Sequence, residues 1–285
     1  MKDGARRSML TERSGVTGRH LPSFAGVAAL VVLALASLPA GADAGPSRLV
    51  EVGAGSLRPF LANADAPPVR VEPFALEDRP VTRAQFAEFV RAVPRWRRGE
   101  VAAILAESGY LGSWESALEP GARARELPVT EVSWHAARAY CRWQGRRLPT
   151  EGEWEWASRA NATRADASDD PEHIRQVLEW YGRPRGALRA SGSGPANVWG
   201  ARDMHGLVWE WVEDFGGSMV TADSRERDER DERRVCGAAA VSGGDPSEYA
   251  TFMRFAFRSS LRAGFALPNL GFRCAADLPN QEETP

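Results

Sequence analysis

Residues 146–157 read RRLPTEGEWEWA and carry the strongest local structural signal in the chain. Thr150 and Glu153 form a capping box, because the threonine hydroxyl can accept a hydrogen bond from one backbone N–H at a helix start while the glutamate accepts from another. We therefore predict a helix that begins after Thr150 and turns Trp154 and Ala157 toward the core.

Two more helices are predicted before this segment. Ser133 is a good N-cap, and the helix that follows it should end at Gly145. Its inward face carries Trp134, Ala137, Tyr140 and Cys141. The earlier helix starts with a second capping box, TRAQ at residues 82–85, and stops at Pro94. Its apolar residues recur at helical spacing, namely Phe86, Phe89, Val90 and Val93.

Three short segments alternate apolar and polar residues as strands do, at residues 50–52, 69–74 and 208–212. In the last of these, Trp209 and Trp211 should share one face while Glu210 lies on the other. Glycine and proline are frequent, and the chain holds 10 tryptophans against 4 tyrosines. We therefore expect an irregular, loop-rich α+β domain in which large aromatic rings supply much of the packing.

The N-terminus has the order of a secretory signal peptide. Basic residues precede an apolar run of 15 residues from Phe24 to Leu38, and an A-x-A cleavage motif ends at Ala44. The run is shorter than the ~20 residues of a membrane-spanning helix. We expect a signal peptide over residues 1–44, export to the periplasm or an equivalent compartment by the Sec or the twin-arginine route, and no membrane span after cleavage. An uncleaved anchor is the alternative.

Composition favours one domain over residues 45–278, followed by a disordered tail at residues 279–285. Hydrophobic residues make up 43% of the chain, which is enough for one large core. The formal net charge of −2 gives no electrostatic basis for binding nucleic acid. Residues 223–234 are dense in Asp, Glu and Arg and should form a solvated loop.

Three blocks are informative together: LPVTEVSW at residues 127–134, RRLPTEGEWEWA at 146–157 and NLGFRC at 269–274. They resemble the signature blocks of the formylglycine-generating enzyme, or sulfatase-modifying factor, family. With GLVWEW at residues 206–211 between them, their order and spacing match the family over nearly all of the mature chain. The resemblance implies a C-type-lectin-like fold, with short twisted strands, a few helices and bound calcium.

Family members that make formylglycine use a cysteine pair to hold copper and activate oxygen, and soft thiolates do select Cu(I). The pair precedes an Arg-x-x-x-Arg element, which Arg258 and Arg262 match here. Residues 243–254 nevertheless contain no cysteine. The resemblance therefore implies a member without the usual two-cysteine mechanism. It leaves open whether the protein is an oxidoreductase and whether it uses copper or iron.

The chain has 3 cysteines. Cys141 and Cys274 match positions that form a disulfide in the family, so the resemblance implies that they pair. Cys236 is then left over. It is interpreted as a buried small side chain rather than a nucleophile, because no neighbouring residue can act as its base.

The resemblance also implies a calcium site. Its ligands would be the side chains of Asp203 and Glu210 and the carbonyls of Gly206 and Val208, a mixture of oxygens that suits a hard cation. Leu207 stands where the family usually has Asn. The alternative is that Asp203 caps a turn and Glu210 pairs with an arginine.

Tyr249, Arg258 and Arg262 are the candidates for a substrate groove, which in the family holds an extended peptide. Guanidinium groups suit carboxylates and carbonyls in such a groove, and the alternative for the arginines is surface ion pairing. His135, His173 and His205 lack the close spacing of a metal site and are interpreted as structural.

Two functions from different classes follow. The first is an exported maturation or accessory factor that binds a partner polypeptide or a peptide-like metabolite. Whether it also oxidises this partner is left open by the resemblance. The alternative is a catalytically inactive lectin-like module that assists an exported, periplasmic metalloenzyme such as a copper nitrite reductase. A sugar-binding lectin ranks third, since exposed tryptophans can stack on sugars. The substrate and the oligomeric state cannot be read from the sequence.

Overall fold

In the computed structural model, the described residues are 47–58, 67–182, 186–216 and 246–279. The expected signal peptide, the loop at 223–234, Cys236 and the tail beyond residue 279 lie outside them. All elements below belong to the unit formed by residues 42–285. None of the described helices is both long and apolar enough to cross a membrane.

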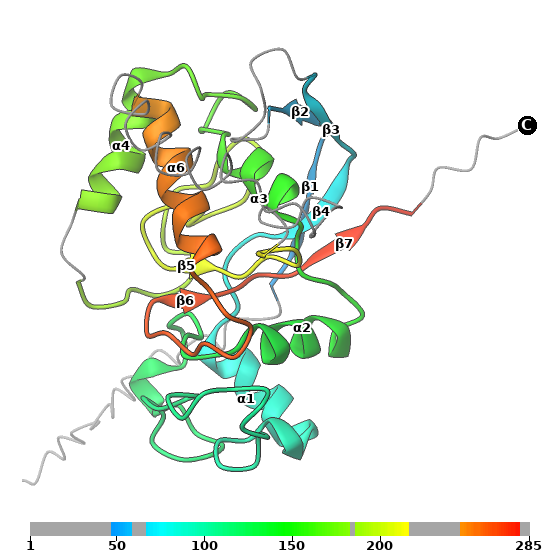
Figure 1. The fold of residues 1–285 in the computed structure, drawn as a ribbon, viewed down its shortest axis with the longest axis vertical. Helices are drawn as coiled ribbons and strands as arrows, with labels where there is room; N and C mark the ends of the chain where they lie inside the picture. Colours follow the sequence, from blue (N-terminus) through cyan, green and yellow to red (C-terminus); the bar gives the residue numbers. More distant parts are fainter. Residues whose placement is uncertain (1–46, 59–66, 183–185, 217–245, 280–285) are drawn as a thin grey trace, which may run out of the picture. The chain divides into compact units, whose positions relative to one another are not determined.

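Short strands form three small sheets (Figure 1). The largest has the antiparallel order β1-β4-β7, with strands Leu49–Val52, Phe74–Glu77 and Ala275–Asp277. In the second, β2 (Gly55–Leu57) pairs antiparallel with β3 (Val69–Val71). In the third, β5 (Trp209–Glu210) pairs parallel with β6 (Leu270–Gly271). The first of these sheets joins segments from opposite ends of the chain.

The expected strand at residues 69–74 is two strands in the structure. β3 ends at Val71 and β4 begins at Phe74 in a different sheet. Pro73 lies between them and has no N–H to continue a ladder, which explains the break. The strand expected at 208–212 is likewise limited to Trp209 and Glu210.

The three predicted helices are confirmed as α1 (Arg83–Ala92), α2 (Trp134–Trp143) and α3 (Glu151–Ser158). Both predicted capping boxes form, with Thr82 accepting from Gln85 N and Thr150 from Glu153 N. Ser133 caps α2 by accepting from Ala136 N. Two further helices, α4 (Pro171–Gly182) and α6 (Pro246–Ser259), were not predicted. They lie side by side (Figure 1).

The core consists of two clusters of buried side chains. One lies around α1 and α2 and includes Trp211, with Trp209 packed against it. The other joins Trp154 and Trp156 of α3 to the strands. Trp209 and Trp211 both pack in the first cluster, whereas Glu210 between them pairs with the buried Arg273.

A disulfide joins Cys141 on α2 to Cys274, as the resemblance implies. The Cα atoms are 5.5 Å apart and the cysteines are separated by 133 positions in the sequence. The bond therefore fixes the last strand segment to the middle of the chain.

Candidate functional site

A buried carboxylate holds the helices of the candidate site in place. Glu155 on α3 accepts hydrogen bonds from Arg254 Nε at 2.9 Å, Arg254 Nη2 at 2.8 Å and Arg258 Nη1 at 2.6 Å. All three side chains are buried. Burial by itself raises the pKa of Glu155, but the charges of Arg254 and Arg258 outweigh it and lower that pKa to about 2. The ionised carboxylate thus attaches α6 to α3.

Aromatic rings connect α6 to α4 and β5. Arg254 Nη1 donates to the hydroxyl of Tyr181 at 3.2 Å. The Tyr181 ring stacks on Trp209 with centroids 5.4 Å apart, and Trp209 stacks on Phe257 at 4.2 Å. Trp180 lies 5.1 Å from Trp209 in a tilted arrangement. The rings of Trp180, Tyr181 and Trp209 also line a pocket, so the contacts that dock the helices shape its wall.

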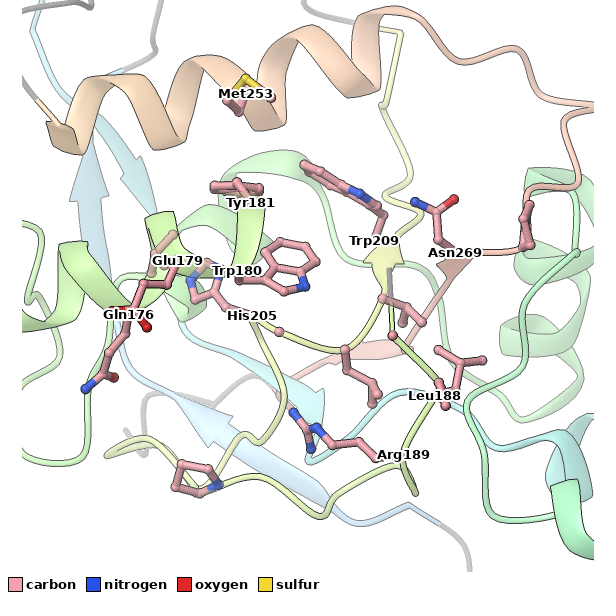
Figure 2. Close-up of a pocket in the computed structure, with 18 of the residues that line it drawn as sticks. Gln176, Glu179, Trp180, Tyr181, Leu188, Arg189, His205, Trp209, Met253 and Asn269 are labelled. Carbon is pink, nitrogen blue, oxygen red and sulfur yellow. The ribbon is translucent and has the colours of Figure 1, made fainter. Parts of the chain in front are cut away.

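This pocket, which we call the α4 pocket, has a volume of about 920 Å³. It is bounded by α4, Met253 of α6 and residues 186–189, 205–209 and 268–269. Figure 2 shows the rings of Trp180 and Trp209 near the centre of the view, with Asn269 beside Trp209 and Arg189 below them. Its volume falls within the ~300–1,000 Å³ usual for ligand sites. It combines an aromatic wall with a few polar groups.

Two histidines, His173 and His205, also line the α4 pocket. His205 Nε2 lies 3.0 Å from the carbonyl of Ser158, which can only accept, so Nε2 carries the proton. His205 Nδ1 is buried and has no hydrogen-bond partner among the described residues. Burial, helped by the charge of Arg254, lowers the pKa of His205 to about 3. The ring of His173 is 6.0 Å away, and burial lowers the pKa of this histidine too.

The three predicted groove residues do not meet in one groove. Tyr249 is 42% exposed, whereas Arg258 is only 4% exposed because Glu155 and Glu151 of α3 bind it. Arg262 is exposed and lies over the ring of Phe265 at 4.6 Å. The charge of Arg258 is thus paired with α3, and the groove role of the three residues stays a prediction.

The expected calcium ligands are engaged by protein donors. The carboxylate of Asp203 accepts from Gly192 N at 2.6 Å and Gly194 N at 3.1 Å, and it pairs with Arg189 at 2.5 Å. Glu210 accepts from Arg273 Nε and Nη2 and from Trp154 Nε1, each at 2.8 Å.

This is the arrangement of the alternative, in which the aspartate caps a turn and the glutamate pairs with an arginine. Among the described residues, no group of three His, Cys, Asp or Glu could hold a metal ion. As arranged, Asp203 and Glu210 do not fit a calcium ion, because each would have to exchange an arginine for it. Gly206 and Val208, whose carbonyls are the other two expected ligands, lie between these residues in the sequence. The calcium site stays a prediction.

Sequence reasoning missed the α4 pocket and its residues Trp180, Arg189 and Asn269. A signal for α4 was present, because an Asp-Pro-Glu start places proline at the first helical position. Asp170 Oδ1 indeed accepts from Glu172 N at 3.0 Å. No comparable local signal marks residues 186–189 and 268–269, which are loop segments that only the tertiary structure brings to the pocket.

The comparisons with known proteins agree with the resemblance. A model described as the sulfatase-modifying factor enzyme 1-like domain matches residues 43–278. The chain is 31% identical over 271 residues to the inactive C-alpha-formylglycine-generating enzyme 2 of Mus musculus, covering 79% of this chain and 85% of that protein. It is 32% identical over 286 residues to the formylglycine-generating enzyme of Mycobacterium tuberculosis, covering 78% and 94%.

Among solved structures, PvdO from Pseudomonas aeruginosa is similar at 19% identity with a TM-score of 0.43, covering 81% of this chain and 94% of that one. The sequence matches alone decide the family, because the family model spans the whole arrangement of helices, sheets and pocket described above. The chain therefore belongs to the formylglycine-generating enzyme, or sulfatase-modifying factor, family.

Proposed function

We propose that this protein is an exported maturation or accessory factor that binds a partner polypeptide or peptide-like metabolite without the two-cysteine copper mechanism. Family membership supports the maturation or accessory role, and formylglycine-generating enzymes act on polypeptides. The signal-peptide pattern of residues 1–44 supports export.

One observation carries the proposal. Residues 246–257, which precede Arg258 of the Arg-x-x-x-Arg element, lie in α6 and contain no cysteine. Arg254 in this segment is buried, and its guanidinium makes three hydrogen-bond contacts to Glu155. A positive group that is bound to a carboxylate cannot hold Cu(I), which prefers soft thiolate or thioether ligands.

The first test is chemical. The protein, produced from the full chain and exported, is incubated with copper, oxygen and a sulfatase-derived peptide, and mass spectrometry looks for the formylglycine aldehyde. We expect none. Formation of the aldehyde at a rate above that of the copper-only control would contradict the proposal.

The second test concerns binding. Random peptides displayed on phage are selected on the exported protein, and synthetic versions of the enriched peptides are titrated by calorimetry. We expect saturable binding with one peptide per protein. Failure to enrich any peptide that then binds in solution would count against a peptide-binding role.

Elemental mass spectrometry separates binding from oxidation. If the protein purified without chelators carries no stoichiometric copper or iron, it acts by binding alone, which is the outcome we expect from the α6 arrangement. Stoichiometric copper or iron would instead support oxidation of the partner. Calcium in the same measurement, if lost in Asp203→Asn, would support the predicted calcium site.

A further inference from the structure

We propose that the α4 pocket binds an aromatic side chain of a peptide, with the ring against Trp180 and Trp209 and the adjoining main chain hydrogen-bonded to Arg189 and Asn269. This inference rests on the proposed function in one respect, namely that the partner is a peptide or peptide-like. It adds which residues bind it and which side chain they select.

The aromatic wall provides the selectivity. Trp180 and Trp209 are both partly exposed, and their rings meet at an interplanar angle of 47° with centroids 5.1 Å apart. Figure 2 shows the two rings bordering the open space of the pocket. A third ring can therefore pack against this corner, and offset or edge-to-face contacts between aromatic rings are favourable beyond their buried area. Leu188, Leu207 and Met253 make further parts of the wall apolar.

Arg189 supplies hydrogen-bond donors without an excess of charge. Its Nη1 is bound to Asp203 and to Ser193 Oγ, while its Nη2 makes no hydrogen bond to a described residue. A Cβ placed on Gly206 would lie 3.9 Å from both Arg189 Nη2 and Trp180 Cδ1, so the guanidinium and the indole flank the same point of the pocket floor. Because the buried carboxylate of Asp203 offsets the positive charge, this donor suits a neutral main-chain carbonyl.

Asn269 can complete the recognition of a peptide unit. Its backbone carbonyl accepts from Trp209 N at 2.9 Å, which fixes the residue beside the aromatic wall. Its side chain lines the pocket and is labelled in Figure 2. An amide side chain offers both a donor and an acceptor, which matches the N–H and C=O of a peptide. An apolar corner flanked by two such groups therefore fits an aromatic residue within a peptide chain.

The direct test uses three probes: the blocked tripeptides acetyl-Ala-Phe-Ala-amide and acetyl-Ala-Ala-Ala-amide, and chitotriose as the sugar. Each is titrated into the exported protein by ligand-observed NMR. We expect the phenylalanine peptide to bind at least tenfold more tightly than the alanine peptide, because the ring buries its apolar area. Equal affinity of the two peptides, or binding of the sugar alone, would overturn the proposal.

Variants locate the binding. Leu207→Trp fills the pocket, and Trp180→Leu removes the wall on which the ring packs. Each should weaken the phenylalanine peptide by about tenfold or more. The matched control is Trp143→Leu, since Trp143 is also partly exposed, at 41%, but lies on α2 outside the lining of the pocket. This control should leave the affinity unchanged.

Asn269→Ala keeps the test decisive if a larger change prevents folding, which thermal melting would reveal. It removes only one side-chain amide and should weaken the peptide by about fivefold, the effect of one ordinary hydrogen bond. If all pocket variants bind the peptide as well as the unaltered protein, the pocket assignment is wrong. The proposed function would survive that result, because the phage-selected peptides would then bind elsewhere.

Discussion

Glu155 is the residue on which the docking of α6 depends. Its carboxylate is the shared partner of Arg254 and Arg258, and all three groups are buried. In Glu155→Gln the two guanidiniums would remain buried with their main counter-charge removed. Breaking a buried ion pair in this way costs about 3–5 kcal/mol. We expect a loss of that size in the free energy of unfolding, measured by urea denaturation.

The matched control is Glu172→Gln on α4. Glu172 also pairs with an arginine, Arg175, but both side chains are exposed to solvent. The urea midpoint of this variant should equal that of the unaltered protein, because exposed ion pairs contribute little. Equal losses in the two variants would mean that burial of the Glu155 cluster is not what makes it stabilising.

His205 should make stability depend on pH above the range in which carboxylates titrate. Its folded pKa is lowered from 6.5 to about 3 by burial and by Arg254. The unfolded chain therefore takes up a proton below pH 6.5 while the folded protein does not, so stability is present above that pH and falls as the pH drops toward 3. Arg254 and Glu155 face the ring from α6 and α3, and His173 faces it from α4.

In His205→Gln, whose amide can still donate to Ser158, this dependence should shrink. Between pH 6.5 and pH 5 the unaltered protein should lose about 1.5–2 kcal/mol more than the variant, at up to ~1.4 kcal/mol per pH unit. Urea titrations at several pH values measure the difference. His173 contributes in the same direction in both proteins, so identical slopes would show that His205 is protonated in the folded state.

At the scale of elements, the three predicted helices all have starts that are encoded locally, and α6, which was missed, is held by residues distant in the sequence. Thr82, Ser133 and Thr150 each cap a helix within one turn, and all three helices were predicted. α6 has no such local signal, because its inward face carries arginines whose partner Glu155 lies 99 and 103 positions earlier in the sequence. A charged residue in a sequence does not reveal that it will be buried.

Arg254→Met should loosen α6 selectively. The methionine keeps an apolar stem but loses the contacts to Glu155 and Tyr181, while Arg258 still neutralises the carboxylate. Local opening of a helix depends on its own tertiary contacts. We expect hydrogen exchange of the backbone amides of α6 to accelerate at least tenfold, while those of α1 and α2 stay as slow as before.

The control for that experiment is Arg175→Met on the exposed side of α4, which should change exchange in neither α6 nor α1. If Arg254→Met accelerates exchange throughout the described helices, then α6 does not open as a unit. The cluster around Glu155 would in that case support the whole fold rather than the wall of the pocket.

At the scale of the whole molecule, the family could be predicted because its blocks contact one another. The NLGFRC block supplies β6, which pairs with β5 from the GLVWEW block. Arg273 and Cys274 of the same block bind Glu210 and Cys141. The α4 pocket could not be predicted in this way, since Trp180 and Arg189 belong to none of the blocks. The family blocks thus encode the scaffold and supply Trp209 and Asn269 to the pocket, while Trp180 and Arg189 come from the segments between the blocks.

The disulfide between Cys141 and Cys274 should be the largest single constraint on the unfolded chain. It closes a loop with a sequence separation of 133. In the chain-entropy model a loop of this length stabilises the fold by about 4–5 kcal/mol. We expect Cys141→Ala/Cys274→Ala to lose that much in urea denaturation, and each single variant to lose a similar amount, because either change removes the whole bond.

Reduction provides the internal check on this prediction. A thiol reductant should lower the urea midpoint of the unaltered protein to that of the double variant and leave the double variant unchanged. If the reductant also lowers the midpoint of the double variant, Cys236 takes part in a disulfide with a second protein molecule or with a small thiol, because that variant has no other cysteine. Non-reducing electrophoresis would separate these two cases, and either would replace the interpretation of Cys236 as a buried single thiol.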